Sequence, residues 1–179
     1  MKFQGLQVIE SGAQTIVSLA DALAQLHIDA GFDDDKVNES IAAAFDFAET
    51  YLWQSLRPQT ILASYSPDGQ NYAELIRANF DELVEVSYFD GAKKSIDISA
   101  VAVDDTLPVP RAYFAEPKVS GDYFAPIKIT YKTKAPAVVP AQVKQAILIA
   151  TAQFYDDRDA SDLSAAERIL NLTKTRYLL

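Results

Sequence analysis

Residues 37–56 read VNESIAAAFDFAETYLWQSL, which is the clearest helical pattern in the chain. Its apolar residues recur three or four positions apart, which is the spacing of one face of an α-helix about five turns long. The apolar residues are Val37, Ile41, Ala44, Phe45, Ala48, Leu52 and Leu56. A stripe of this length has to pack against other elements, so it predicts a hydrophobic core. Pro58 disfavours helical conformation at the residue before it, which places the end of the helix close to Leu56.

A shorter helix precedes this one. Three leucines have helical spacing: Leu19, Leu23 and Leu26. Asp21 follows Ser18 by three residues, where its carboxylate can accept hydrogen bonds from the free N–H groups of a first turn. The pattern predicts a helix from Ser18 to about Ile28. The acidic turn at 29–35 then leads into the longer helix, because the positive pole at a helix N-terminus favours carboxylates.

After the long helix, residues 60–134 show the alternation of a β-structure. The segment 83–89 (LVEVSYF) runs into Asp90-Gly91, a dipeptide typical of tight hairpins, and 95–103 is the expected returning strand. The segment 127–132 (IKITYK) alternates as a later strand. We also expect a strand in the segment 72–80, although its apolar residues could form a helix.

Prolines divide the segment before the last of these strands. Residues 106–126 contain Pro108, Pro110, Pro117 and Pro126, which predicts a string of short extended pieces and a mobile loop. Alternate lysines follow at positions 128, 132 and 134, and we interpret them as a solvated strand face.

Two more helices are predicted towards the end of the chain. Pro136 and Pro140 frame the entry to a helix over 141–159, in which Val143, Ile147, Ala150 and Phe154 repeat at helical spacing. The string Ser164-Ala165-Ala166-Glu167 has the form of a capping box and predicts that a fourth helix begins at Ser164. The fold class that follows is α+β, with a mainly helical core of about four helices and a β-strand insertion between the second and third. We expect one domain over 1–179, with helical parts at 15–57 and 140–173, the insertion at about 60–134 and a C-terminal tail at 174–179.

The composition restricts the function. The net charge of −9 argues against a protein that binds nucleic acid through phosphate contacts, because that affinity rests on Lys and Arg. The chain has no cysteine, which excludes disulfides, thiolate metal ligands and a cysteine nucleophile, and is typical of a reducing compartment. It lacks an apolar run of about 18 residues and a signal-peptide core, so we expect neither a membrane span nor export.

The sequence also lacks the usual signs of catalysis. His27 is the only histidine, and we interpret it as a residue that ends the first helix. No Gly-x-Ser-x-Gly or phosphate-binding glycine motif is present. The acidic runs at 33–35 and 104–105 lack the ligand spacing of a calcium loop, so we interpret them as helix caps and turns. We therefore predict a protein that is not an enzyme and has no catalytic residue, cofactor or metal.

Two groups of residues are candidates for a subunit interface. Asp156, Asp157 and Arg158 lie near the end of the third predicted helix, where acids oppose the helix dipole and favour an external partner; the alternative is a solvated cluster. Tyr51 and Trp53 lie off the apolar stripe of the long helix. Aromatic residues of this kind anchor protein interfaces, and the alternative is that they fill the core.

The order of these elements resembles that of the head-tail connector (adaptor) proteins of long-tailed bacteriophages and related prophages. The resemblance rests on the acidic turn at 29–35 and on six strings in the same order, which together span most of the chain: 19–29 (LADALAQLHID), the long helix 37–56, 83–91 (LVEVSYFDG), 126–131 (PIKITY), 139–149 (VPAQVKQAILI) and 155–158 (YDDR). The segment 106–126 is longer than is usual in that family.

The resemblance implies a ring subunit beneath the portal of a DNA-filled capsid, which joins it to the tail or the next connector ring and lines the DNA exit channel. The implied partners are other copies of the chain in a dodecamer, the portal protein, a head-closure or tail protein, and DNA that passes through the lumen without specific binding; no membrane is involved. The implied location is the head-tail interface of the virion, after assembly in the cytoplasm of a bacterial host. Connectors of this kind use a C-terminal segment to dock on the portal, here Lys174, Arg176, Tyr177, Leu178 and Leu179.

Two alternatives to this function stay open. A head-closure or tail-completion protein would be richer in β-structure and would lack the pair of N-terminal helices. A small ligand-binding module or enzyme would need a concave pocket with converging polar groups and perturbed titration.

Overall fold

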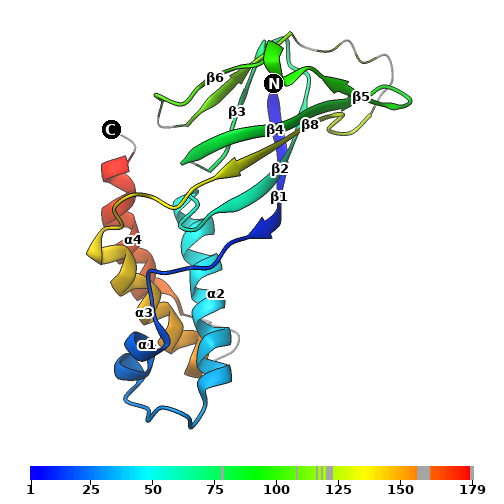
Figure 1. The fold of residues 1–179 in the computed structure, drawn as a ribbon. Coiled ribbons are helices and arrows are strands. Elements are labelled where there is room, and N and C mark those ends of the chain that lie inside the picture. The colour runs from blue at the N-terminus through cyan, green and yellow to red at the C-terminus, as the bar shows by residue number, and fades with distance from the viewer. Residues whose placement is uncertain are drawn as a thin grey trace. The chain divides into compact units, whose positions relative to one another are not determined.

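The chain folds into two compact units, shown in a computed structural model (Figure 1). One unit, here the strand unit, comprises Met1–Ala13 and Arg57–Ala135; the other, the helical unit, comprises Gln14–Leu56 and Pro136–Leu179. The structure describes residues 1–77, 79–107, 109–115, 117, 119, 123–156 and 162–177, with 174–177 described by backbone alone.

The α+β fold class is confirmed. Within the described residues there are four α-helices and two antiparallel sheets, and seven of the eight strands lie between the second and third helices (Figure 1). Each of the two units has a hydrophobic core of its own. That the whole chain 1–179 forms one domain stays a prediction.

The helical unit packs around the predicted long helix. Its helices are α1 (Leu19–Leu26), α2 (Asp34–Leu52), α3 (Ala141–Asp156) and α4 (Ser164–Tyr177). All seven apolar residues of the predicted stripe are buried in one core, together with Val143, Ala146, Ile147 and Ala150 of α3 and Ala166 and Leu170 of α4. Helix α3 lies between α2 and α4 and contacts α1 as well, so the two sequence-distant helical parts close one core.

The helix ends show where local sequence signals were sufficient. Helix α1 begins with a complete capping box: the Ser18 hydroxyl accepts from the N–H of Asp21 at 3.1 Å, and the Asp21 carboxylate accepts from the N–H of Ser18 at 2.9 Å. Helix α2 ends at Leu52, earlier than expected, because Trp53 adopts the left-handed conformation with φ 54° and its N–H bonds to the carbonyl of Glu49. Leu56 still reaches the core from the turn that follows.

Helix α4 begins at Ser164 as predicted, but a different residue caps it. The carboxylate of Asp162 accepts from the N–H of Ser164 at 3.0 Å, so the cap lies before the predicted box. The backbone of 174–177 continues as α4, where the sequence indicated a tail. Helix α3 is described to Asp156, and the predicted extension to 159 lies outside the described residues.

The strand unit contains two sheets. The strands are β1 (Lys2–Ser11), β2 (Gln59–Ser66), β3 (Tyr72–Glu74), β4 (Phe80–Phe89), β5 (Lys93–Ile96), β6 (Ala102–Asp104), β7 (Arg111–Tyr113) and β8 (Ile127–Thr133), with a short 3-10 helix η1 (Ile98–Ala100) before β6. The larger sheet has the order β1-β2-β8-β4-β5 and the smaller one the order β3-β7-β6. Strand β8 is the centre of the larger sheet and alternates buried and exposed residues, as its sequence predicts.

One face of the larger sheet is buried against the smaller sheet. Its core residues are Ile61, Ala63, Tyr65, Val86, Ile127, Ile129 and Tyr131, which cluster with Ala73, Leu75, Ala112 and Phe114 of the smaller sheet and its flanks. The Tyr65 hydroxyl donates to the carbonyl of Glu74 at 2.6 Å, and the Tyr131 hydroxyl donates to the carbonyl of Ile76. The opposite face of the larger sheet carries the polar positions of the alternating strands.

The hairpin at Asp90-Gly91 is confirmed, with Gly91 at φ 76° in the turn. The returning strand is β5, which begins two residues earlier than expected and ends at Ile96, because Asp97 caps η1 through the N–H of Ser99 at 2.9 Å. The segment expected as a strand at 72–80 contains β3 and the first residue of β4. Strand β7 lies within the proline-rich segment, and strand β1 lies before the first helix, where no element was predicted.

Candidate functional site

The described residues hold no group of three or more His, Cys, Asp or Glu side chains that could bind a metal ion. Within the same residues no helix has the length and hydropathy to cross a membrane. His27 is the C-cap of α1, as interpreted from the sequence, and adopts the left-handed conformation with φ 57°. The carboxylate of Asp104 accepts from the N–H and hydroxyl of Thr106, so this acidic pair forms a turn as interpreted.

The acidic turn before α2 combines local and long-range contacts. The Asp34 carboxylate accepts from the N–H of Gly31 at 2.9 Å, which is turn chemistry as interpreted. Asp33 is the N-cap residue of α2, but its carboxylate makes no capping bond and accepts instead from the Tyr155 hydroxyl at 2.9 Å. This bond is the main reason that the pKa of Tyr155 lies above its usual value, with burial and nearby carboxylates adding to the rise. The turn is therefore fixed to the end of α3.

The two aromatic interface candidates differ in exposure. Tyr51 is half-buried, packs against the helical core and has its ring centre 5.8 Å from that of Phe47, which matches the alternative that it fills the core. Trp53 is 51% exposed just after the last residue of α2. The exposed side chain and the left-handed backbone make Trp53 the better of the two candidates for an interface anchor.

The remaining candidates lie at or beyond the limits of the described residues. Asp156 is exposed as the last residue of α3, and Asp157 and Arg158 lie outside the described residues. Of the proposed portal-docking residues, the backbones of Lys174, Arg176 and Tyr177 belong to α4, and Leu178 and Leu179 lie outside the described residues. Their roles stay predictions.

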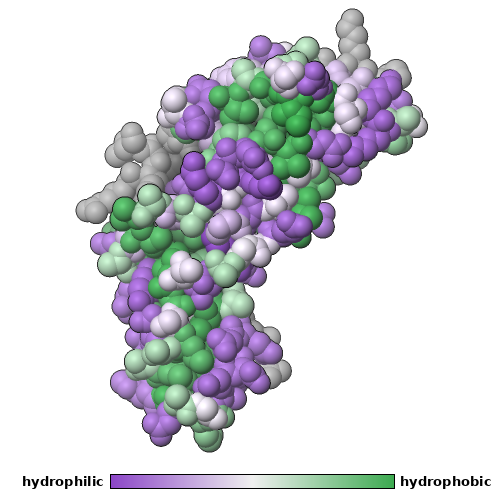
Figure 2. Space-filling model, in the orientation of Figure 1, coloured by the Kyte–Doolittle hydropathy of each residue, from purple (hydrophilic) through white to green (hydrophobic). Residues whose placement is uncertain are grey.

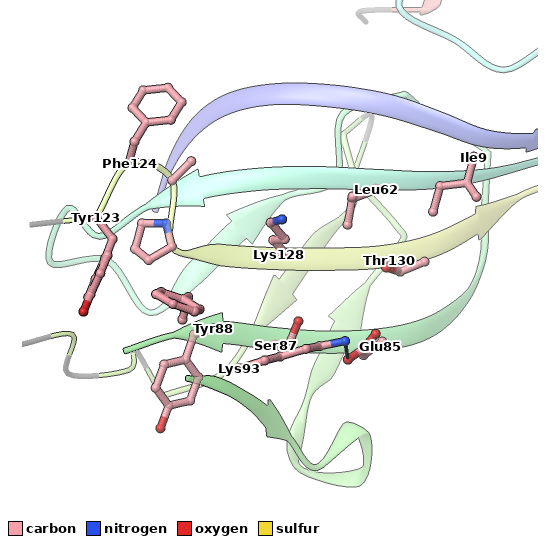
Figure 3. A pocket seen from close by; sticks show the side chains of 13 residues that line it. Ile9, Leu62, Glu85, Ser87, Tyr88, Lys93, Tyr123, Phe124, Lys128 and Thr130 are labelled. Carbon is pink, nitrogen blue, oxygen red and sulfur yellow. Dashed lines mark ion pairs between the residues drawn. The ribbon is translucent and has the colours of Figure 1, made fainter. Parts of the chain in front are cut away.

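The structure adds a surface that the sequence did not indicate, a groove of about 520 Å³ on the outer face of the larger sheet (Figure 3). The strand register places Leu62, Thr130 and Glu85 in one row across β2, β8 and β4, and Lys128 and Ser87 in the next row of β8 and β4. Figure 3 shows Tyr123 and Phe124 at the end of the groove where β8 begins and Ile9 at the opposite end.

The groove is apolar at both ends and carries one unpaired cation on its floor. Phe124 is 86% exposed, and Ile9 and Tyr123 are exposed as well. Lys93 pairs with Glu85 at 2.6 Å, whereas Lys128 has no ionic partner among the described residues. Figure 2 shows that hydrophobic residues gather in patches on the strand unit in that view as well as along the helices. We refer to this surface, lined by Ile9, Leu62, Ser87, Tyr123, Phe124, Lys128 and Thr130, as the sheet groove.

The prediction of a solvated face for lysines 128, 132 and 134 is confirmed, because all three are exposed. Lys132 pairs with the exposed Glu82 at 2.6 Å, and Lys134 with the exposed Asp81 at 4.0 Å. Lys128 differs from the other two in having no ionic partner among the described residues; its neighbours on β2 and β4 are Ser64 and Ser87, and the apolar residues of the groove lie farther along it. Leu62 was the one available signal, since it is an apolar residue on the solvent-facing side of β2.

Comparison with known proteins gives structural matches only: no family model and no curated protein matches the sequence. Three similar solved chains come from gene transfer agent (GTA) particles. A chain from the virion of a native GTA particle is 14% identical with a TM-score of 0.67, and the match covers 97% of this chain and 95% of that one. A chain from the neck of a native GTA particle, computed with C12 symmetry, is 16% identical with a TM-score of 0.61 over 96% and 94%. A chain from the neck of an empty GTA particle, computed with C6 symmetry, is 14% identical with a TM-score of 0.65 over 87% and 85%. At these identities the likeness is one of fold, and it includes both units.

Proposed function

We propose that this chain is a head-tail connector (adaptor) subunit that forms a ring in the neck of a phage-like particle and joins the DNA-filled capsid to the tail or the next connector ring. The observation that carries the proposal is the match of the fold, over 87% of the chain or more, to chains from GTA particles, two of them from necks computed with C6 and C12 symmetry. A fold shared over nearly the whole chain, in both units, favours a shared structural role without catalysis.

The ring is built from a head-to-tail contact between unlike surfaces, because such a contact closes when the rotation between copies permits. The chain offers unlike surfaces: the helical unit exposes Trp53, and the strand unit exposes the sheet groove. Twelve copies in the virion would match the symmetry with which one of the similar necks was computed.

The charge of the chain fits a channel for DNA. With a net charge of −9, a ring presents an acidic wall on average, which lets DNA pass through the lumen without specific binding. A map of the assembled ring with Lys and Arg side chains lining the lumen would contradict this part of the proposal.

The C-terminal end of α4 docks on the portal protein in this proposal. The segment 174–179 is both basic and apolar, a combination that suits a protein interface. Replacing Tyr177, Leu178 and Leu179 by Ser is expected to weaken binding to purified portal rings. Leu172→Ser is the matched control, since Leu172 is an exposed leucine of the same helix. Equal binding by both variants would refute this docking site.

The pair of N-terminal helices favours a connector over a head-closure or tail-completion protein, which was expected to lack it. Both α1 and α2 are present, and both belong to the core of the helical unit. A head-closure or tail-completion protein would also help to join heads to tails. The two functions differ in the direct partner of the chain, because a connector binds the portal ring itself.

A deletion experiment tests the proposed function. Particles produced without this chain are expected to accumulate as heads and separate tails, and supplying the chain from a plasmid is expected to restore complete particles. Complete, infectious or DNA-transferring particles without the chain would contradict the proposal.

A further inference from the structure

Two surfaces, the sheet groove and the acidic turn before α2, carry charged side chains that have no ionic partner among the described residues. In the groove, the Lys128 ammonium has no ionic partner among the described residues and lies between Leu62 and the exposed end at Phe124 (Figure 3). An unpaired cation in a groove with apolar ends favours a partner that brings both a carboxylate and an apolar side chain.

The acidic turn presents this combination. Phe32 is 80% exposed at its tip, so its ring is available to anchor a partner. The carboxylates of Asp29 and Asp35 flank it and have no hydrogen-bond or ionic partner among the described residues, whereas those of Asp33 and Asp34 are used within the unit. The bond from Tyr155 to Asp33 holds the turn in place, so Phe32 is presented on a fixed support.

We propose that the acidic turn of one copy docks in the sheet groove of the adjacent copy, with Phe32 between the apolar ends of the groove and a carboxylate of the turn against Lys128. The proposal rests on the proposed ring function and names its subunit contact. The occupant is a second copy because the charges of the two surfaces are complementary: Lys128 is positive and the acidic turn is negative. Copies of a chain with net charge −9 repel one another on average, so a contact between them needs a local positive charge of this kind.

The size of the groove agrees with this occupant. Its volume of about 520 Å³ lies within the range of roughly 300–1,000 Å³ typical of pockets that hold small ligands, which is ample for one aromatic side chain. The contact joins a surface of the helical unit to a surface of the strand unit, so it is heterologous, as a ring with more than two copies requires.

The absence of cysteine in the chain allows a direct cross-linking test. Two variants of different tagged length, Phe32→Cys and Phe124→Cys, are mixed, assembled with portal rings and treated with a short bismaleimide, which tolerates more separation than a disulfide does. We expect a cross-linked product of one long and one short chain. The matched control replaces Phe32→Cys by Leu172→Cys, an exposed position on α4, and is expected to give no product.

Charge reversal tests the ionic half of the contact. Lys128→Glu is expected to reduce ring assembly at least tenfold. Adding Asp35→Lys to the same chain is expected to restore assembly, because each subunit contact then again joins one positive and one negative side chain. Both positions are exposed, so the fold is expected to survive, which circular dichroism checks. Asp35→Lys alone is expected to weaken assembly as well.

The outcomes separate this inference from the proposed function. Neck assembly by the wild type, without a cross-linked product from the mixed Phe32→Cys and Phe124→Cys variants, would overturn the inference and leave the function intact. A product in a chain carrying both cysteines, but not between the mixed single variants, would show a contact within one chain and would also overturn it. A wild type that joins no neck component would contradict the proposed function itself.

Discussion

The carboxylate of Glu49 accepts a hydrogen bond from the backbone N–H of Leu56 at 2.8 Å, and Glu49 is only 1% exposed. The bond joins the last turns of α2 to the non-helical segment that leaves it after Trp53. A carboxylate can remain buried at this point because the N–H of Leu56 in the exit segment donates to it in place of water. The buried acid therefore fixes the path of the chain where α2 ends.

Glu49→Ala is expected to destabilise the helical unit by about 1–3 kcal/mol, because the N–H of Leu56 loses its acceptor and stays buried. Urea unfolding followed by fluorescence measures this, since Trp53 is the only tryptophan and lies four residues away in the same unit. Glu39→Ala, at an exposed position of the same helix, is the control and is expected to change stability by less than about 0.5 kcal/mol. Equal effects of the two variants would rule out this role for Glu49.

Trp53→Gly is expected to weaken assembly while it leaves the stability of the folded chain nearly unchanged. Glycine relieves the left-handed strain at φ 54° but raises the entropy of the unfolded chain, so the free energy of unfolding should change by no more than about 1 kcal/mol. If Trp53 anchors a subunit contact, assembly with portal rings should weaken at least tenfold.

His27→Gly provides the matched control, because His27 has the same left-handed conformation at the end of α1. It is expected to retain normal assembly. Circular dichroism follows unfolding of both variants, and analytical ultracentrifugation follows assembly. Normal assembly of Trp53→Gly would remove Trp53 from the interface.

Acid is expected to weaken the first turn of α1. The bonds from the backbone and hydroxyl of Ser18, together with Lys144 at 3.0 Å, lower the pKa of Asp21 to about 2. A carboxyl whose pKa is lower in the folded state stabilises the fold above its unfolded pKa of about 4, and this contribution is lost as the pH falls through about 2.

Asp21→Asn should therefore reduce the pH dependence of the urea midpoint between about pH 4 and pH 2. Asp35→Asn is the control, since the carboxylate of Asp35 has no partner among the described residues. An unchanged slope in Asp21→Asn would contradict this assignment.

Alkali is expected to destabilise the strand unit first. Burial raises the pKa of both Tyr65 and Tyr131 well above the usual tyrosine value. Their contribution is fully present below the unfolded pKa of about 10 and is lost as the pH rises above it, because only the unfolded chain ionises freely.

Tyr65→Phe should therefore cost about 1 kcal/mol at neutral pH, through the lost bond to the carbonyl of Glu74, and should lessen the loss of stability above about pH 10. Tyr123→Phe, at an exposed tyrosine of the same unit, is the control. The test fails if both variants lose stability equally as the pH rises.

The elements that the sequence predicts well are those with strong local signals. The stripe of α2, the capping box at Ser18 and the alternation of β8 each depend on residues close together in the chain, and each is present in the structure. The hairpin at Asp90-Gly91 belongs to the same group, because its turn residues specify the backbone directly.

The missed elements depend on distant partners. Strand β1 contains Gly5 and two register shifts against β2, which interrupt the alternation that would have identified it. Strand β7 has three residues within a proline-rich segment and exists through pairing with β3 and β6. The sheet groove combines side chains from β1, β2, β4 and β8 with Tyr123 and Phe124, so its one local signal, the apolar Leu62 on the outer side of β2, could not indicate it alone.

The most direct test of the connector assignment is the mass of the assembly that this chain forms with purified portal rings, measured by native mass spectrometry. We expect one complex in which the chain is present in twelve copies for each portal ring, and the Lys128→Glu variant should form it poorly. A chain that stays unbound, or that binds the portal in one or two copies without closing a ring, would contradict the connector assignment.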